Sequence, residues 1–151
     1  MSDGRVWFTT AMLAGLVHAA ASLFWTLGGT WLLDTVGDFA VEMQEEGAAS
    51  TRALLGAVTL AKAAGAVVPW WGHRSQPAPR WIRVASWAGA GVLLLWGGAG
   101  MLGAWAGLAG GGTLQDPALA GHALLWDPLF VLWGAALAAG LRATRPGDLD
   151  T

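Results

Sequence analysis

The chain has 151 residues, of which 55% are hydrophobic and only 12% are charged, and its 8 basic and 10 acidic residues give a net charge of −2. Soluble domains carry about 25% charged residues, so this composition excludes an ordinary globular protein and equally a disordered one. The near-neutral charge balance offers no basic surface for nucleic acid. The absence of cysteine excludes disulfides, a thiol nucleophile and a cysteine-ligated zinc site.

Four apolar stretches are long enough to cross a bilayer, which takes roughly 20 helical residues. They cover residues 6–33, 51–71, 81–108 and 118–141, and Gly, Pro or charged residues separate them. The sequence therefore predicts an all-α membrane protein with a single domain over residues 1–151, folded as a four-helix transmembrane bundle. In the fourth stretch, Asp116-Pro117 predicts a helix start and Pro128 predicts a kink. Asp127 could alternatively be only the N-cap of a helix that begins at Pro128.

Basic residues gather on one side of the predicted bundle. Arg52 falls on the other side and Lys62 inside a span, whereas the rest lie on the side that holds both termini and the second connection: Arg5, Arg74, Arg80, Arg83, Arg142 and Arg145. Cytoplasmic connections are usually the arginine-rich ones. We therefore expect both termini in the cytoplasm and a multi-pass protein of the cell's inner (plasma) membrane.

The first connection carries a helical pattern of its own. Val36, Phe39, Ala40 and Met43 recur at helical spacing, and the opposite face is acidic. This pattern predicts a short amphipathic helix on the outer surface. Its acidic face is either simply solvated or a site for a cation or a partner.

The eleven tryptophans fall into two groups. Six lie near the predicted membrane boundaries, where tryptophan belts are common: Trp7, Trp70, Trp71 and Trp81 on the inner side, Trp31 and Trp105 on the outer side. The deeper group comprises Trp25, Trp87, Trp96, Trp126 and Trp133. Such residues either pack in the core or line a ligand cavity.

Four ionisable residues fall inside the predicted spans: His18, Lys62, His122 and Asp127. A Lys or Asp at the bilayer centre costs roughly 2.5–3.5 kcal/mol on insertion scales, so each needs a partner or a function. Helical spacing places His18 and Lys62 near mid-membrane and Asp127 somewhat nearer the outside. All three side chains can point into the interior of the same helix bundle. On a continuous helix His122 lies about 140° from Asp127 and should not join them.

Two segments carry a resemblance to a known family. Ser22 to Trp31 contains Trp25-Thr26-Leu27-Gly28-Gly29, and Trp126 to Gly134 reads Trp-Asp-Pro-Leu-Phe-Val-Leu-Trp-Gly. In these motifs, and in length and hydropathy, the chain resembles an uncharacterised family of small four-span bacterial membrane proteins, a domain of unknown function. That family has a His three residues before the first Trp, where this chain has Ser22; His18 lies one turn earlier on the same face. The resemblance implies an architecture and no reaction.

The first functional hypothesis is a membrane-embedded enzyme acting by acid–base chemistry on a lipophilic molecule. Asp127 would be the general acid, Lys62 would orient it or bind developing negative charge, and His18 would be the base. The candidate substrate-binding residues are Ser22, Trp25, Trp96 and Trp133, whose indole rings could face a cationic intermediate. Isomerisation, epoxide opening or cyclisation of a terpenoid- or polyketide-like substrate would use such groups.

Two further hypotheses remain open. In one, Lys62 and Asp127 form a buried ion pair that makes the chain a structural or accessory subunit. In the other, the same two residues are the switching pair of a small proton-coupled transporter. Haem bound through His18 and His122 fits poorly because their depths differ, and we expect no cofactor and no metal site. The expected partners are a lipophilic small molecule, membrane lipid and a second copy of the chain in a homo-oligomer, but no nucleic acid.

Overall fold

The computed structural model describes residues 2–74 and 78–144, and this part of the chain is helical and contains no strand. The elements are α1 (Ser2–Thr26), the 3-10 helix η1 (Asp34–Val36), α2 (Asp38–Glu46), α3 (Ala49–Gly72), α4 (Arg80–Ala109), α5 (Pro117–Leu124) and α6 (Trp126–Ala143). Four segments are long and apolar enough to cross a membrane: Gly4–Thr26, Ala49–Gly72, Arg80–Ala109 and Pro117–Ala143. The predicted all-α membrane protein with four apolar helices is confirmed.

The first span is shorter than predicted. We expected it to continue to residue 33, but α1 ends at Thr26. Gly28 follows with a φ of 96°, a left-handed conformation that a helix cannot continue through and that glycine adopts without strain. The apolar residues after it form a turn that packs back onto the bundle, where Leu33 is buried against Trp25 and Trp126.

The fourth span is broken, as the proline predicted, but at a different residue. The chain leaves helical geometry at Leu125, which has φ −125° and ψ −73°, and not at Pro128. A proline inside a helix lacks the N–H for the carbonyl four residues earlier and its ring clashes with that carbonyl, so the distortion lies on its N-terminal side. Upstream, α5 begins at Pro117 as predicted, and the Asp116 carboxylate accepts from the backbone N–H groups of Ala118 and Leu119.

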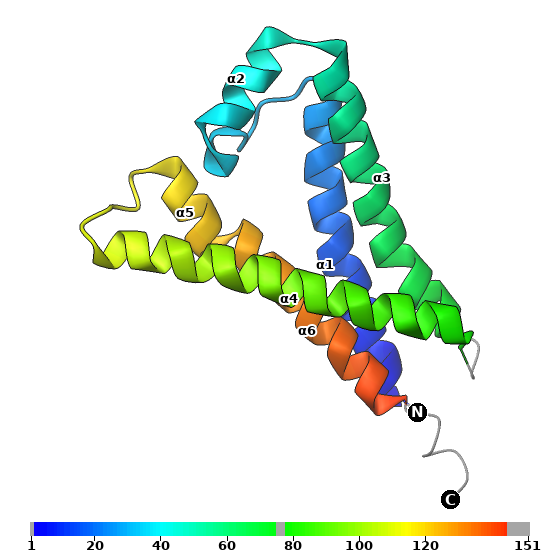
Figure 1. The fold of residues 1–151 in the computed structure, drawn as a ribbon. Helices are drawn as coiled ribbons and strands as arrows, with labels where there is room; N and C mark the ends of the chain where they lie inside the picture. Colours follow the sequence, from blue (N-terminus) through cyan, green and yellow to red (C-terminus); the bar gives the residue numbers. More distant parts are fainter. Residues whose placement is uncertain (1, 75–77, 145–151) are drawn as a thin grey trace, which may run out of the picture.

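The four long helices form two pairs that cross. Helix α1 packs along α3, α4 packs along α6, and the strong contact between α1 and α6 joins the pairs, whereas α3 and α4 touch only weakly. Figure 1 shows the pairs converging near the N-terminus and diverging toward α2 and α5. At the crossing, Gly15 lets the Trp133 ring reach α1, because a Cβ there would lie only 2.7 Å from the indole. The buried core around this contact includes Phe8, Leu137 and Leu141.

The predicted amphipathic helix in the first connection is present as α2. It rests on the outer end of α1, where the Gln44 side-chain amide donates to the carbonyl oxygens of Trp25 (2.9 Å) and Gly29 (3.2 Å). Phe39, which we expected on its apolar face, is 60% exposed. Since η1 also contacts α5, the first connection ties the two diverging helix pairs together at this end.

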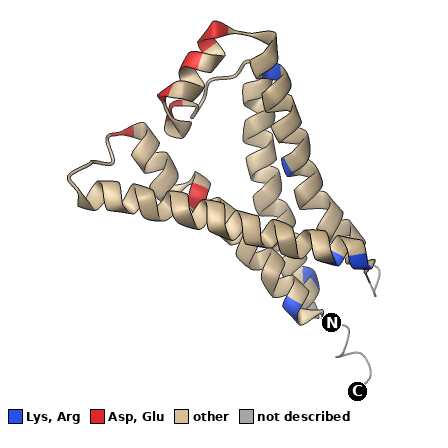
Figure 2. Cartoon of the chain, in the orientation of Figure 1, with Lys and Arg blue, Asp and Glu red and all other residues tan. Residues whose placement is uncertain are grey.

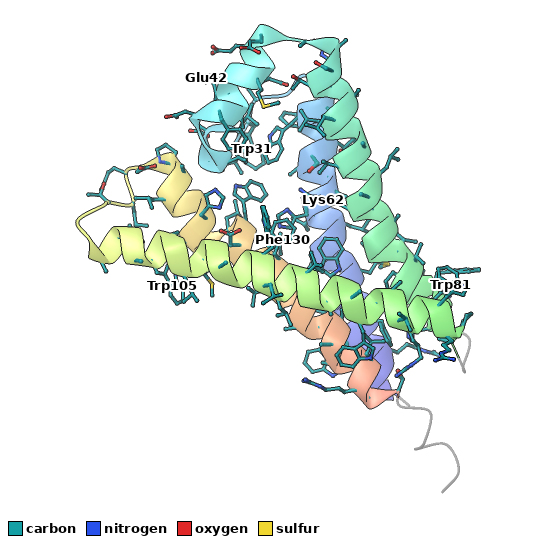
Figure 3. All side chains as sticks on the ribbon, in the orientation of Figure 1. Trp31, Glu42, Lys62, Trp81, Trp105 and Phe130 are labelled. Atoms are coloured by element: carbon teal, nitrogen blue, oxygen red, sulfur yellow. The ribbon has the colours of Figure 1, made fainter. Side chains whose placement is uncertain are left out.

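Charge and tryptophan mark the two ends of the molecule. Figure 2 shows basic residues mainly at the converging end and acidic residues mainly around α2 and α5. Trp81 is exposed at the converging end, and Trp31 and Trp105 are exposed toward the other end (Figure 3). This polarity agrees with the charge asymmetry of the sequence, and the cytoplasmic position of the termini stays a prediction. Arg145, one of the residues that supports it, lies outside the described residues.

Candidate functional site

The polar interior of the bundle is built around Lys62, on α3. Its ammonium group donates to the Ser22 hydroxyl on α1 over 2.9 Å and lies 5.5 Å from the centre of the Phe130 ring on α6 (Figure 3). Phe130 also stacks against the His18 imidazole, with the ring centres 3.8 Å apart. We call His18, Ser22, Lys62 and Phe130 the Lys62 cluster. The sequence predicted the inward placement of three of its members.

His18 is buried within the Lys62 cluster, with 3% of its surface exposed. Its Nε2 lies 3.0 Å from the carbonyl oxygen of Trp126, beside the break in the fourth span. Because a carbonyl only accepts hydrogen bonds, Nε2 carries a proton and donates. This contact and the stacking on Phe130 hold the ring between α1 and α6.

The structure separates Asp127 from the Lys62 cluster. The Asp127 carboxylate is buried, and its Oδ2 lies 2.8 Å from Nδ1 of His122. This is the one ion pair within residues 2–74 and 78–144. The sequence-based exclusion of His122 was therefore wrong, because the angle between the two residues was calculated for an unbroken helix and the break at Leu125 rotates α5 relative to α6.

His122 connects three elements of the structure. Its Nδ1 lies against the Asp127 carboxylate on α6, and its second nitrogen, Nε2, lies 3.3 Å from the carbonyl oxygen of Val36 at the end of η1. His122 itself belongs to α5. The His122–Asp127 pair therefore links η1, α5 and α6.

Gly100 on α4 makes room for the Asp127 carboxylate. A Cβ at this position would collide with Oδ2 and would lie 2.6 Å from the carboxyl carbon. The carboxylate therefore lies against the bare backbone of α4, with His122 on its other side. This position accounts for the burial of Asp127 and keeps it out of contact with Lys62.

A cavity of about 560 Å³ lies between α3, α4 and α6. Lys62 and Ser86 are the polar residues of its lining, together with the Trp133 indole; the rest is apolar, from Val58 and Pro69 of α3 to Leu137 of α6. Ala64, Val68, Ala85 and Val92 of the lining are exposed at the surface. The cavity consequently opens sideways between α3 and α4, toward the lipid of a surrounding membrane.

The predicted substrate-binding residues do not share one site. Ser22 is buried against Lys62, and Trp133 lines the cavity. Trp25 instead borders a second, apolar cavity of about 440 Å³ on the far side of α1 and donates its indole N–H to the Trp31 carbonyl oxygen. Trp96 is 71% exposed on α4 and lies away from the others.

Phe130 and Ser86 were not predicted as site residues from the sequence. Phe130 contacts both Lys62 and His18, and it belongs to the Trp-Asp-Pro-Leu-Phe motif that supported the family resemblance. Ser86 is the only hydroxyl residue in the predicted third span, which could have identified it. The rest of the contribution of α4 to the cavity could not be predicted, because its other lining residues are apolar like those elsewhere on the helix.

The described residues contain no cluster of three side chains suited to holding a metal ion. The two histidines considered for haem are engaged elsewhere: His18 with the Trp126 carbonyl oxygen and His122 with Asp127 and the Val36 carbonyl oxygen. Neither points to a cofactor.

The fold and the buried polar residues define a small membrane protein with four apolar helices and a cavity that opens between α3 and α4. The family model described as Protein of unknown function (DUF3995) matches residues 15–137, which include the Lys62 cluster, the His122–Asp127 pair and every residue of the cavity lining. The chain belongs to this family, and the resemblance noted from the two Trp-containing motifs is confirmed. Comparison with curated proteins and with solved structures gives no match.

Proposed function

We propose that this chain is an enzyme of the inner (plasma) membrane that binds a lipophilic small molecule in the cavity between α3 and α4 and acts on it through Lys62. The observation that carries the proposal is a mid-span ammonium group on the wall of an otherwise apolar cavity. A cavity of about 560 Å³ is within the usual range of roughly 300–1,000 Å³ for small-molecule sites, and ligand sites combine apolar walls with few polar groups in this way. Its lateral opening suits a substrate dissolved in lipid.

The reaction class that fits is proton transfer. Lys62 would donate a proton to a carbonyl or epoxide oxygen of the substrate, and the resulting amine would accept a proton from a neighbouring carbon. Isomerisation, cyclisation or opening of an epoxide with loss of a proton would each return Lys62 to its starting state. We assign this role to Lys62 and not to Asp127, because Lys62 lines the cavity and Asp127 is enclosed by His122 and Gly100.

The structural-subunit and transporter hypotheses lose their shared basis. Both required Lys62 and Asp127 to interact, and within the described part of the chain each has a different partner. The ion pair that the bundle does contain, His122–Asp127, ties the outer connection to the fourth span.

The proposal is tested by identifying what copurifies with gently solubilised protein. Gly89 lines the cavity and has open space at its Cβ, so Gly89→Leu should fill the cavity without a clash. Gly98 on the same helix also has open space but does not line it, which makes Gly98→Leu the matched control. Mass spectrometry should find a lipophilic compound bound to wild-type and Gly98→Leu protein and lost from Gly89→Leu. Equal retention by both variants, or an empty wild-type protein that converts no lipophile, would contradict the proposal.

A further inference from the structure

We infer that the cavity between α3 and α4 takes a lipophile with a single carboxylate head group, such as a long-chain carboxylic acid, and binds that carboxylate through Lys62. This inference rests on the proposed function and specifies its ligand. The starting point is a missing counter-charge. Buried cations in a membrane interior are normally paired with a carboxylate or with backbone carbonyls, yet the Lys62 ammonium has only the neutral Ser22 hydroxyl and the Phe130 ring as partners within the described residues.

The chain offers no carboxylate of its own to this cation. Asp127, the one acidic residue in the span segments of the structure, is already paired with His122. The remaining described acidic side chains belong to the connections at the outer end, on η1, α2 and the α4–α5 loop. An anion brought by a ligand would therefore supply what Lys62 lacks.

The polarity of the lining favours the same head group. Ser86 and Trp133 line the cavity, but their Oγ and Nε1 atoms are buried and are not accessible from it. The ammonium group of Lys62 is therefore the polar group of the lining that a ligand can reach, and a lysine only donates hydrogen bonds. A carboxylate, which only accepts, is complementary to this donor, whereas a lipophilic amine is not.

The number of cations limits the charge of the ligand. Lys62 is the only basic residue of the lining, and no arginine fork is present there to bind a phosphate in two places. One ammonium group balances a monoanion such as a carboxylate. The apolar remainder of the lining, including Val58, Val92 and Leu137, would contact the hydrocarbon tail.

The test is a competition experiment on detergent-solubilised protein with radiolabelled oleate as the probe. We expect unlabelled oleate to displace it, methyl oleate to be weaker by about tenfold or more because it cannot form the charge-assisted bond, and oleylamine not to compete. Lys62→Met should lower oleate affinity to that of methyl oleate, Lys62→Arg should retain most of it, and Gly89→Leu should abolish binding while Gly98→Leu does not.

The ester comparison uses the wild-type protein, so it does not depend on how any variant folds. If methyl oleate competes as well as oleate and Gly89→Leu abolishes the binding of both, the carboxylate inference is wrong. In that case the cavity still binds lipophiles as proposed. Oleate binding unaffected by Lys62→Met, or by Gly89→Leu, would also overturn the inference. If neither compound binds and no lipophile copurifies, the proposed function fails with it.

Discussion

The Lys62 ammonium group lies 2.9 Å from the Ser22 hydroxyl, and this hydrogen bond joins α3 to α1 in the interior of the bundle. Hydrogen bonds between membrane helices contribute about 0.6 kcal/mol on average. This contact is therefore too weak to explain why a cation is retained in the span. The arrangement is easier to understand if Lys62 acts on a ligand than if it stabilises the fold.

The first prediction concerns the two buried charges. Lys62→Met should change stability little, and its effect should add to that of Asp127→Asn within about 0.5 kcal/mol, because the residues share no contact. Unfolding in mixed micelles measures the single and double variants. Ser22→Ala serves as the positive control, since it should couple to Lys62→Met. If the double variant of Lys62 and Asp127 were more stable than the sum of the two single effects predicts, the two side chains would interact, contrary to the structure.

A second prediction tests the His122–Asp127 pair. Replacing His122 by Asn and Asp127 by Asn, alone and together, should show a coupling energy of about 0.5–1 kcal/mol. We expect the low end of the usual range because the His122 side chain is 41% exposed and water weakens the attraction. The same micelle unfolding assay applies. Strictly additive effects would show that the pair does not link α5 to α6.

The third prediction uses the glycines of α4. Gly100→Ala should lower stability by about 1–3 kcal/mol, the usual result of forcing extra atoms into a packed site, because its Cβ would displace the Asp127 carboxylate. Gly98→Ala, two residues away with open space at its Cβ, is the control and should be neutral or slightly stabilising. Thermal unfolding of both variants in one detergent gives the comparison. Equal midpoints would mean that the carboxylate does not lie against α4.

The fourth prediction concerns pH at the converging end, outside the spans. His73 stacks on Phe8 with ring centres 4.1 Å apart, and this burial lowers the pKa of its imidazole below the usual 6.5. The hydrogen bond to the Pro69 carbonyl oxygen raises the pKa and the positive charge of Arg83 lowers it further, by smaller amounts than burial. A histidine with a lower pKa when folded binds fewer protons than when unfolded.

The contribution of His73 to the free energy of unfolding is consequently fully present above pH 6.5. It is lost as the pH falls from 6.5 through the lower pKa of the folded state. His73→Phe retains a ring against Phe8 and removes the titrating group. The difference in unfolding free energy between wild type and His73→Phe should therefore shift against the wild type on acidification. A difference that is independent of pH would show that burial does not perturb His73.

The helices could be predicted from hydropathy, and the site only in part. Apolar length located α3 and α4 to within a few residues, because lipid-spanning helices follow composition. Periodicity placed Lys62, His18 and Ser22 inward, since α1 and α3 are unbroken between them. The same calculation failed for His122 and Asp127, which lie on opposite sides of the backbone break at Leu125. The break changes the angle about the helix axis between any residue of α5 and any residue of α6. The cavity depends on how α4 crosses α3, which no local pattern encodes.

Binding of a lipophile in the cavity can be measured by photolabelling of the solubilised protein with a long-chain carboxylic acid that carries a diazirine on its tail, followed by peptide mapping. We expect labels on the cavity lining of α3 and α4, between Val58 and Pro69 and between Ile82 and Leu93. These labels should be suppressed in Gly89→Leu and retained in Gly98→Leu. Labels spread evenly over the exposed faces of all four long helices, or confined to the second cavity beside Trp25 and Trp31, would contradict this expectation.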